Sequence, residues 1–278
     1  MALFKTTVLL VVLMTLFIGV GFALGGVQGM IIALLIGLAM NFFAYWKSDQ
    51  LALRMAGAKE VTLQEEPKLH QIVAEVSSLA GLPKPKVYVI QNDAPNAFAT
   101  GRNPEHAAVA ATTGIMRLLT DRELRAVMGH ELGHVKNRDI LISSVVATIA
   151  GAISMLAWMS LLFRSSRGYG ALISLAAMIL APLAAGIIQA GITRTREFQA
   201  DRSGAEITHD PESLASALLK LHQGVKARPM EATPMAESTA HLYIVHPFKA
   251  GGVANLFSTH PPVEERVKRL RDMAYKRT

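Results

Sequence analysis

The sequence predicts a mainly α-helical chain with four transmembrane helices and a polar α+β domain that contains a small sheet. Hydrophobic residues make up 51% of its 278 residues and charged residues only 18%, whereas soluble chains carry about a quarter charged residues. The charges avoid three long apolar stretches, and the polar remainder combines helical periodicity with short apolar runs. The chain has no cysteine, which excludes disulfides, thiolate nucleophiles and cysteine-ligated metals.

The first apolar stretch, from Thr6 to Trp46, carries no charged residue. A single helix of this length would measure about 60 Å, twice the roughly 30 Å of a bilayer's hydrocarbon core. The glycine-rich sequence Gly25–Gly29 indicates a turn in its middle. We therefore predict a transmembrane hairpin over residues 1–46, with spans at about 6–24 and 29–46. A signal peptide fits less well, because its apolar region would be only about 7–15 residues long.

The other two uncharged stretches run over residues 140–163 and 168–193 and are separated by the short polar turn Arg164–Arg167. Each is long enough to cross a bilayer, so we predict a second transmembrane hairpin over residues 140–193. These stretches are rich in alanine and serine, which leaves a second interpretation open: a helical hairpin buried inside a soluble domain.

The net charge of +7 bears on topology and on partners. With four spans, both termini and the first polar segment lie on one side of the bilayer, and that side carries most basic residues near the membrane. These are Lys5, Lys47, Arg54, Lys59, Lys136, Arg138, Arg194 and Arg196. The positive-inside rule then places the polar segments in the cytoplasm. No stacking or nucleic-acid-binding motif accompanies the basic residues, so we expect no nucleic-acid partner.

The polar segments, residues 47–139 and 194–278, are each small, and we expect them to pack as one domain. Their periodicity and turn signals predict helices over residues 67–80, 121–137, 211–225 and 262–274, and strands over residues 86–90 and 107–113. The helix that begins at Asp121 has a clear start signal, because Thr120 and Glu123 have the spacing of a capping box.

The sequence His130-Glu131-Leu132-Gly133-His134 lies within this helix. Two histidines four residues apart share a helix face, so both imidazoles can bind one zinc ion. Glu131 then lies beside the metal, where its carboxylate can take a proton from water as a general base. An ordinary core role is a poor alternative, because burying two histidines and a glutamate without partners is costly.

A third protein ligand is needed if water is to occupy the fourth position. Glu197 and Asp201 follow the last apolar stretch and share a helix face, so Glu197 can bind zinc while Asp201 orients a ligand imidazole. The alternative is that both carboxylates pair with neighbouring arginines on a solvated face. The remaining histidines lack a helical partner and fit surface or core roles; they include His106, His209, His222, His241 and His246.

These residues resemble the HtpX family of membrane-bound zinc metalloproteases, relatives of the CAAX prenyl endopeptidases. The resemblance covers nearly the whole chain and includes, in order, the amino-terminal hairpin, Asn96–Gly101, His130–His134, Arg196–Arg202, Ser258–Pro262 and Glu265-Arg266. It implies a cytoplasmic, zincin-like α+β metalloprotease domain. It also implies one zinc ion per chain on His130, His134 and Glu197, with Glu131 as base, and quality-control cleavage of misfolded membrane proteins at a bacterial inner membrane.

Two further roles are weaker predictions. By analogy with related sites, His260 in the sequence Thr259-His260-Pro261-Pro262, or else Arg202, supplies a second donor to the oxyanion; a plain helix-start turn explains His260 equally well. The segment Asn96–Gly101 is either an ordinary turn or an edge strand that pairs with extended substrate. In the second case the substrate-binding residues are Asn96, Ala97, Phe98 and Ala99.

The leading hypothesis is therefore an integral membrane zinc endopeptidase whose partners are misfolded membrane proteins and the lipid bilayer. A channel or transporter would need ionisable residues within the spans, and the apolar stretches contain none. A membrane scaffold with a non-catalytic metal site and a CAAX-type prenyl-peptide protease remain the alternatives.

Overall fold

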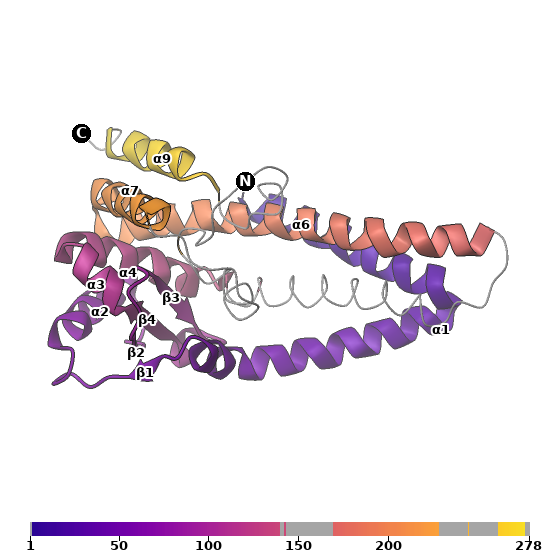
Figure 1. Cartoon of the computed structure of the whole chain (residues 1–278), viewed down its shortest axis with the longest axis horizontal. Helices are drawn as coiled ribbons and strands as arrows, with labels where there is room; N and C mark the ends of the chain where they lie inside the picture. The colour runs from indigo at the N-terminus through magenta and orange to yellow at the C-terminus, as the bar shows by residue number, and fades with distance from the viewer. Residues whose placement is uncertain (1, 140–141, 143–168, 228–243, 245–260, 276–278) are drawn as a thin grey trace. The chain divides into compact units, whose positions relative to one another are not determined.

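The computed structural model describes residues 2–139, 142, 169–227, 244 and 261–275. It is mainly helical with one small mixed sheet, as the sequence predicts (Figure 1). The chain divides into two compact units. The first unit contains residues 1–46 and 142–195, and the second contains residues 47–141 and 196–278. We call the second the catalytic unit because it contains the residues for which the sequence predicts catalysis, Glu131 among them.

Two long helical elements dominate the first unit. α1 (Ala2–Met55) is interrupted at Gly25 and Gly26, whose backbone angles are not helical, so the label covers two helices. Gly26 has a φ of +58°, a conformation that glycine adopts without strain. α6 (Tyr169–Thr208) contributes its residues up to Thr195 to this unit and the rest to the catalytic unit.

No helix in the described part of the chain is both long and apolar enough to cross a membrane. The four predicted transmembrane helices are therefore not confirmed.

The sheet of the catalytic unit has the strand order β1-β2-β4-β3. Its strands are β1 (Lys59–Glu60), β2 (Lys86–Ile90), β3 (Ala97–Thr100) and β4 (Ala108–Thr112). β2 and β4 are parallel, whereas β1 pairs with β2 and β3 with β4 in antiparallel fashion. β3 is thus an edge strand, which is one of the two interpretations that the sequence leaves open for this segment.

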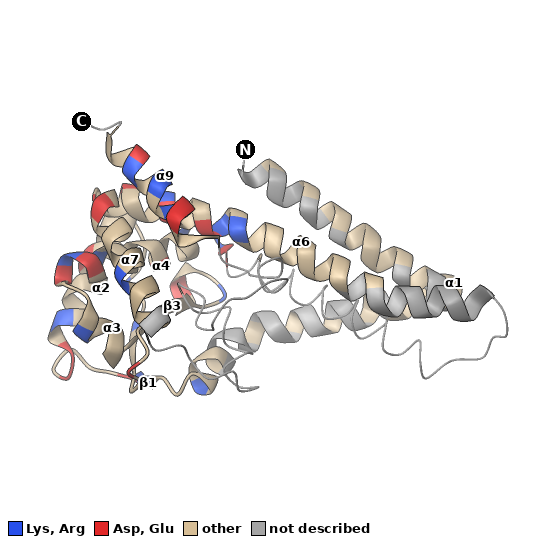
Figure 2. Ribbon diagram, turned by 45° about the horizontal axis from the view of Figure 1, so that its top comes forward, with Lys and Arg blue, Asp and Glu red and all other residues tan. Residues whose placement is uncertain are grey.

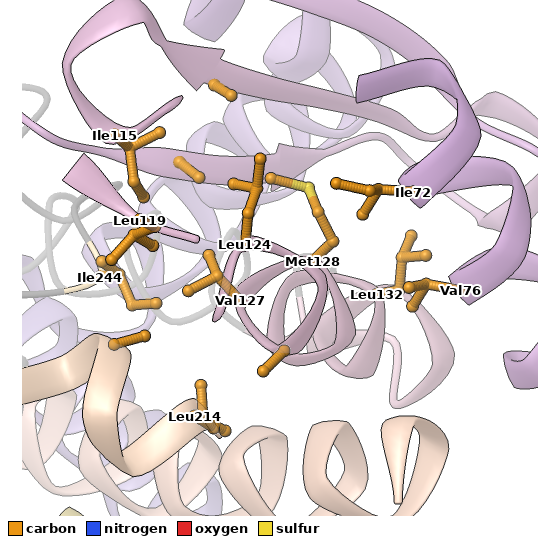
Figure 3. Close-up of a cluster of buried hydrophobic side chains, with 14 of the residues drawn as sticks. Ile72, Val76, Ile115, Leu119, Leu124, Val127, Met128, Leu132, Leu214 and Ile244 are labelled. Carbon is orange, nitrogen blue, oxygen red and sulfur yellow. The ribbon is translucent and has the colours of Figure 1, made fainter. Parts of the chain in front are cut away.

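The core of this unit is built around the central helix α4 (Asp121–Lys136). α4 contacts helices α2 (Pro67–Ala80) and α7 (Pro211–Ala227) and strand β3. Figure 3 shows the apolar face of α4, including Leu124, Val127 and Met128, among buried side chains of the neighbouring elements. His130 and Glu131 are buried in the same helix, next to this apolar face.

The predicted helices agree with the structure to within two residues at each end. The last of them corresponds to α9 (Val263–Tyr275). Sequence patterns missed the two-residue strand β1, the short helix α3 (Thr113–Leu118) and the 3-10 turn η1 (Pro104–His106), which are too short to show a period.

Candidate metal centre and active site

α4 begins with the predicted capping box. Thr120 accepts a hydrogen bond from the backbone N–H of Glu123, and the Glu123 carboxylate accepts one from the backbone N–H of Thr120. His130 and His134 are four residues apart within this helix, so they lie one turn apart on the same face. Their rings are 4.7 Å apart between centroids and nearly perpendicular.

A close approach between α4 and the end of α6 brings the remaining site residues to these histidines. A β-carbon added at Gly204 would lie 2.6 Å from the backbone nitrogen of His130, and one at Gly133 would lie 3.1 Å from the carbonyl oxygen of Ala200. The first distance excludes any side chain at position 204, and the second is tighter than an ordinary contact. Glu197 and Asp201 therefore face the histidines rather than solvent, and both are buried.

Three side chains converge as candidate metal ligands. The two Nε2 atoms of His130 and His134 are 3.2 Å apart. The Glu197 carboxylate lies 3.3 Å from Nε2 of His134 and 3.7 Å from Nε2 of His130. A tetrahedral ion with bonds of about 2.0–2.1 Å holds its ligand atoms about 3.3 Å apart. The spacing of the three side chains therefore fits a single divalent ion.

The other ring nitrogen of each histidine faces an aspartate. Nδ1 of His130 lies 3.0 Å from Asp201, and Nδ1 of His134 lies 2.9 Å from Asp139. These carboxylates fix the ring proton on Nδ1, so both Nε2 atoms present lone pairs to the same point. Two lone pairs and a carboxylate repel one another unless a cation lies between them, which is the chemistry of a metal centre.

Each of the two aspartates contacts a buried arginine. Arg266 of α9 donates to both oxygens of Asp201, at 2.8 and 2.7 Å. Burial raises the pKa of Asp201, but the charge and hydrogen bonds of Arg266 outweigh it and hold the pKa below its ordinary value. Arg196 of α6 pairs with Asp139 and also donates to the backbone carbonyl of Asn137.

Glu131 is 5% exposed and lies next to the candidate ligands. Burial raises the pKa of its carboxyl group, although the two imidazoles act in the opposite direction. One carboxylate oxygen accepts a hydrogen bond of 2.8 Å from the backbone N–H of Ala99 in β3. The edge strand therefore positions a protonatable carboxylate beside the candidate metal ligands.

The structure does not bring every predicted site residue to this centre. Arg202 is exposed and its guanidinium pairs with Glu206 at 2.8 Å, one turn further along α6. His260 lies outside the described residues. The side chain of Asn96 accepts a hydrogen bond from the backbone N–H of Ile244, and Ala97 and Phe98 are buried.

Sequence reasoning missed Asp139 and Arg266, and considered Arg196 only as a surface partner. A signal for Arg266 was present: it falls on the apolar face of α9 with Val263, Val267 and Leu270, where an arginine needs a buried partner. Asp139 directly precedes a long uncharged stretch, but nothing in its sequence spacing links it to His134.

Comparisons with known proteins agree with this geometry. The model of peptidase family M48 matches residues 63–274. Proteins named "Protease HtpX homolog" are 53% identical in Paraburkholderia phytofirmans, over 97% of this chain and 96% of that protein, and 53% identical in Methylibium petroleiphilum, over 99% of both. A third, from Polynucleobacter necessarius subsp. necessarius, is 54% identical over 97% of this chain and 95% of that protein.

The fold is also similar to that of a solved structure, the crystal structure of S. mikatae Ste24p. The TM-score is 0.56 at 17% sequence identity, and the match covers 93% of this chain and 61% of that one. The predicted HtpX resemblance and the predicted metallopeptidase activity are thereby confirmed. The chain belongs to peptidase family M48, a family of metal-dependent peptidases.

Proposed function

We propose that this peptidase is an integral membrane zinc endopeptidase that cleaves misfolded or damaged membrane proteins. The observation that carries the proposal is the convergence of two imidazole Nε2 atoms and the Glu197 carboxylate beside the buried carboxylate of Glu131. Two histidines and one glutamate are a frequent ligand set for catalytic zinc, because they leave the fourth position open.

The reaction follows from the positions of the chain's own groups. A bound zinc ion supplies Lewis acidity, which acidifies a water molecule and polarises the scissile carbonyl. Glu131 takes the proton of the attacking water and passes it to the leaving amine. The N–H of Ala99 orients the Glu131 carboxylate for both transfers. His260 stays our prediction for the second oxyanion donor; Arg202, the second choice, pairs with Glu206 at the surface.

The edge of β3 is our candidate for substrate pairing. The backbone carbonyl of Asn96 accepts a hydrogen bond from Thr112 N–H, so Phe98 and Thr100, which alternate with it, also bond toward β4. The backbone groups of Ala97 and the carbonyl of Ala99 then point away from β4, toward the side where an extended peptide can add as a further strand, while the N–H of Ala99 is bonded to Glu131. Pairing through backbone groups suits a peptidase that acts on many unfolded sequences.

The first unit supports the proposal of a lipid bilayer as partner. Large apolar side chains of α1 are well exposed, among them Phe4, Val11, Leu35 and Phe42. Figure 2 shows the charged residues gathered on the helices of the catalytic unit, whereas the described residues of α1 and α6 in the first unit are almost all uncharged. We propose the bacterial inner membrane as the location, with the active site facing the cytoplasm.

Substitution of the base tests this function. Glu131→Gln keeps the shape of the side chain but cannot accept a proton, so we expect zinc to stay bound while cleavage of an unfolded membrane protein falls about 10²–10⁴-fold. Both proteins are purified in detergent and assayed with and without chelator. Retained turnover in the variant contradicts the mechanism. A scaffold holds zinc without cleaving anything, and a CAAX-type protease cleaves only prenylated peptides.

A further inference from the structure

Arg266 is fully buried in α9, far along the chain from the HExxH sequence. Its guanidinium makes four contacts. Nε and Nη2 donate to the two oxygens of Asp201, Nη1 donates to the backbone carbonyl of Ile244 at 2.8 Å, and the same Nη1 lies 3.3 Å from Glu197. One guanidinium thus contacts both a candidate metal ligand and the carboxylate that faces His130.

Charge balance gives a reason for this arrangement. Glu131, Glu197 and Asp201 are three buried carboxylates in one small volume. A divalent ion supplies two positive charges and Arg266 the third, so the loaded centre is neutral. The remaining pair, Asp139 with Arg196, is already neutral. Without Arg266 the centre keeps an uncompensated buried negative charge, which is costly in a medium of low dielectric constant.

We propose that Arg266 is a positioning residue of the metal centre: it fixes Glu197 and Asp201 for metal binding, and it makes that binding depend on the docking of α9. This inference rests on the metal site of the proposed function. Arg266 touches neither the substrate nor the metal, and acts only through the two carboxylates.

The planar fork of the guanidinium is essential to this role. A lysine ammonium is a point charge, so it cannot hold both oxygens of Asp201 and also reach the carbonyl of Ile244. Ile244 is itself fixed, because its side chain is buried and its N–H donates to Asn96 at 3.2 Å. The orientation of Arg266 is therefore set by the core as well as by the carboxylates.

The test compares zinc affinity in three variants of the full chain in detergent, by competition with a chromophoric chelator. We expect Arg266→Met to weaken zinc binding about 10–100-fold, the usual effect of removing groups that orient metal ligands. We expect Arg266→Lys to recover only part of this loss. The control is Arg271→Met on the same helix, whose exposed pair with Glu212 should leave zinc affinity unchanged.

A role limited to holding the fold is separated from positioning by the visible spectrum of the cobalt-loaded protein. If Arg266 positions the ligands, the spectrum of cobalt-loaded Arg266→Lys should differ from that of the cobalt-loaded native protein. We expect this difference even if the metal-free variant and the metal-free native protein unfold at the same temperature. If Arg266→Met fails to fold, the double variant Asp201→Asn/Arg266→Met removes the buried charges together, and it should bind zinc more weakly than Asp201→Asn alone, because the contact of Arg266 with Glu197 is lost as well. Native zinc affinity and an unchanged cobalt spectrum in the folded variants overturn the inference, whereas a native chain without zinc overturns the proposed function instead.

Discussion

The two imidazoles of the proposed metal centre each face an aspartate that pairs with an arginine, and these partners come from different parts of the chain. We define the His130 side as His130, Asp201 and Arg266, and the His134 side as His134, Asp139 and Arg196. On each side an aspartate faces Nδ1 of the imidazole and an arginine pairs with that aspartate. Both imidazoles therefore present the same tautomer to the metal.

The two sides differ in exposure and in origin. The side chain of His130 is 1% exposed and that of His134 is 17% exposed. Arg196 immediately precedes Glu197 on α6, whereas Arg266 lies on α9 near the end of the chain. The His134 side thus needs only α4, its continuation and α6. The His130 side is complete only when α9 has docked, so we expect zinc affinity to depend more on the His130 side than on the His134 side.

The substitution Gly204→Ala is expected to have the largest effect on the metal centre, because it acts on both sides at once. The added β-carbon would lie 2.6 Å from the His130 backbone, so α4 and α6 must separate. We expect the free energy of unfolding to fall by about 1–3 kcal/mol and zinc affinity to fall with it. Thermal unfolding and chelator competition measure both.

Gly224→Ala is the matched control, since a β-carbon there meets only side-chain atoms at ordinary contact distances, of Pro95 at 3.5 Å and of Leu118 at 3.7 Å. We expect this change within α7 to be neutral or to stabilise by up to about 1 kcal/mol. Equal destabilisation by the two substitutions would mean that the close approach of α4 and α6 is not what holds the site.

Comparing Asp201→Asn with Asp139→Asn sharpens the difference between the two sides. In each variant the asparagine amide accepts the hydrogen bond from the histidine Nδ1–H less strongly than the aspartate carboxylate does. We therefore expect zinc affinity to fall in both variants. We expect a loss of about 10–100-fold for Asp201→Asn, and of less than about tenfold for Asp139→Asn, because water can reach the more exposed His134. Chelator competition on both proteins provides the measurement, and a larger loss for Asp139→Asn would reverse our ranking of the two sides.

Glu123→Gln is expected to have the smallest effect on the metal centre, because it changes the start of α4 and neither side of the site. Burial raises the pKa of Glu123, but the bonds from Lys220, Thr120 and Ser216 outweigh it and lower the pKa to about 2. The carboxylate therefore contributes stability above its ordinary pKa of 4.5, and that contribution is lost as the pH falls toward about 2.

We expect Glu123→Gln to lower the free energy of unfolding at neutral pH by about 1–3 kcal/mol and to leave zinc affinity unchanged. Acid titrations of the metal-free native and variant proteins should differ least near pH 2. A constant difference between the two proteins from pH 7 to pH 2 would contradict the assigned pKa.

Local patterns were sufficient to predict much of the catalytic unit. The capping box of α4 and the pairing of His130 with His134 each involve residues only three or four positions apart in one helix, and the structure has both. The i, i+4 spacing of Glu197 and Asp201 placed them on one face of a helix, and that face is buried against α4.

Contacts between distant segments could not be predicted in the same way. Asp139 and Arg266 reach the centre only through tertiary packing. The residue pattern of one segment shows that a charge is buried, but it does not predict which residue of another segment will pair with it. The prediction of four transmembrane helices depended on hydropathy alone and stays unconfirmed.

Zinc content tests the central claim most directly. The native chain, Glu197→Ala and Glu206→Ala are purified in detergent under the same metal-buffered conditions, and zinc is measured per chain. Glu206 lies on the same helix but pairs with Arg202 at the surface. We predict about one zinc per native chain and per Glu206→Ala chain, and a clear loss in Glu197→Ala. Undiminished zinc in Glu197→Ala would contradict the assignment of this carboxylate as the third ligand.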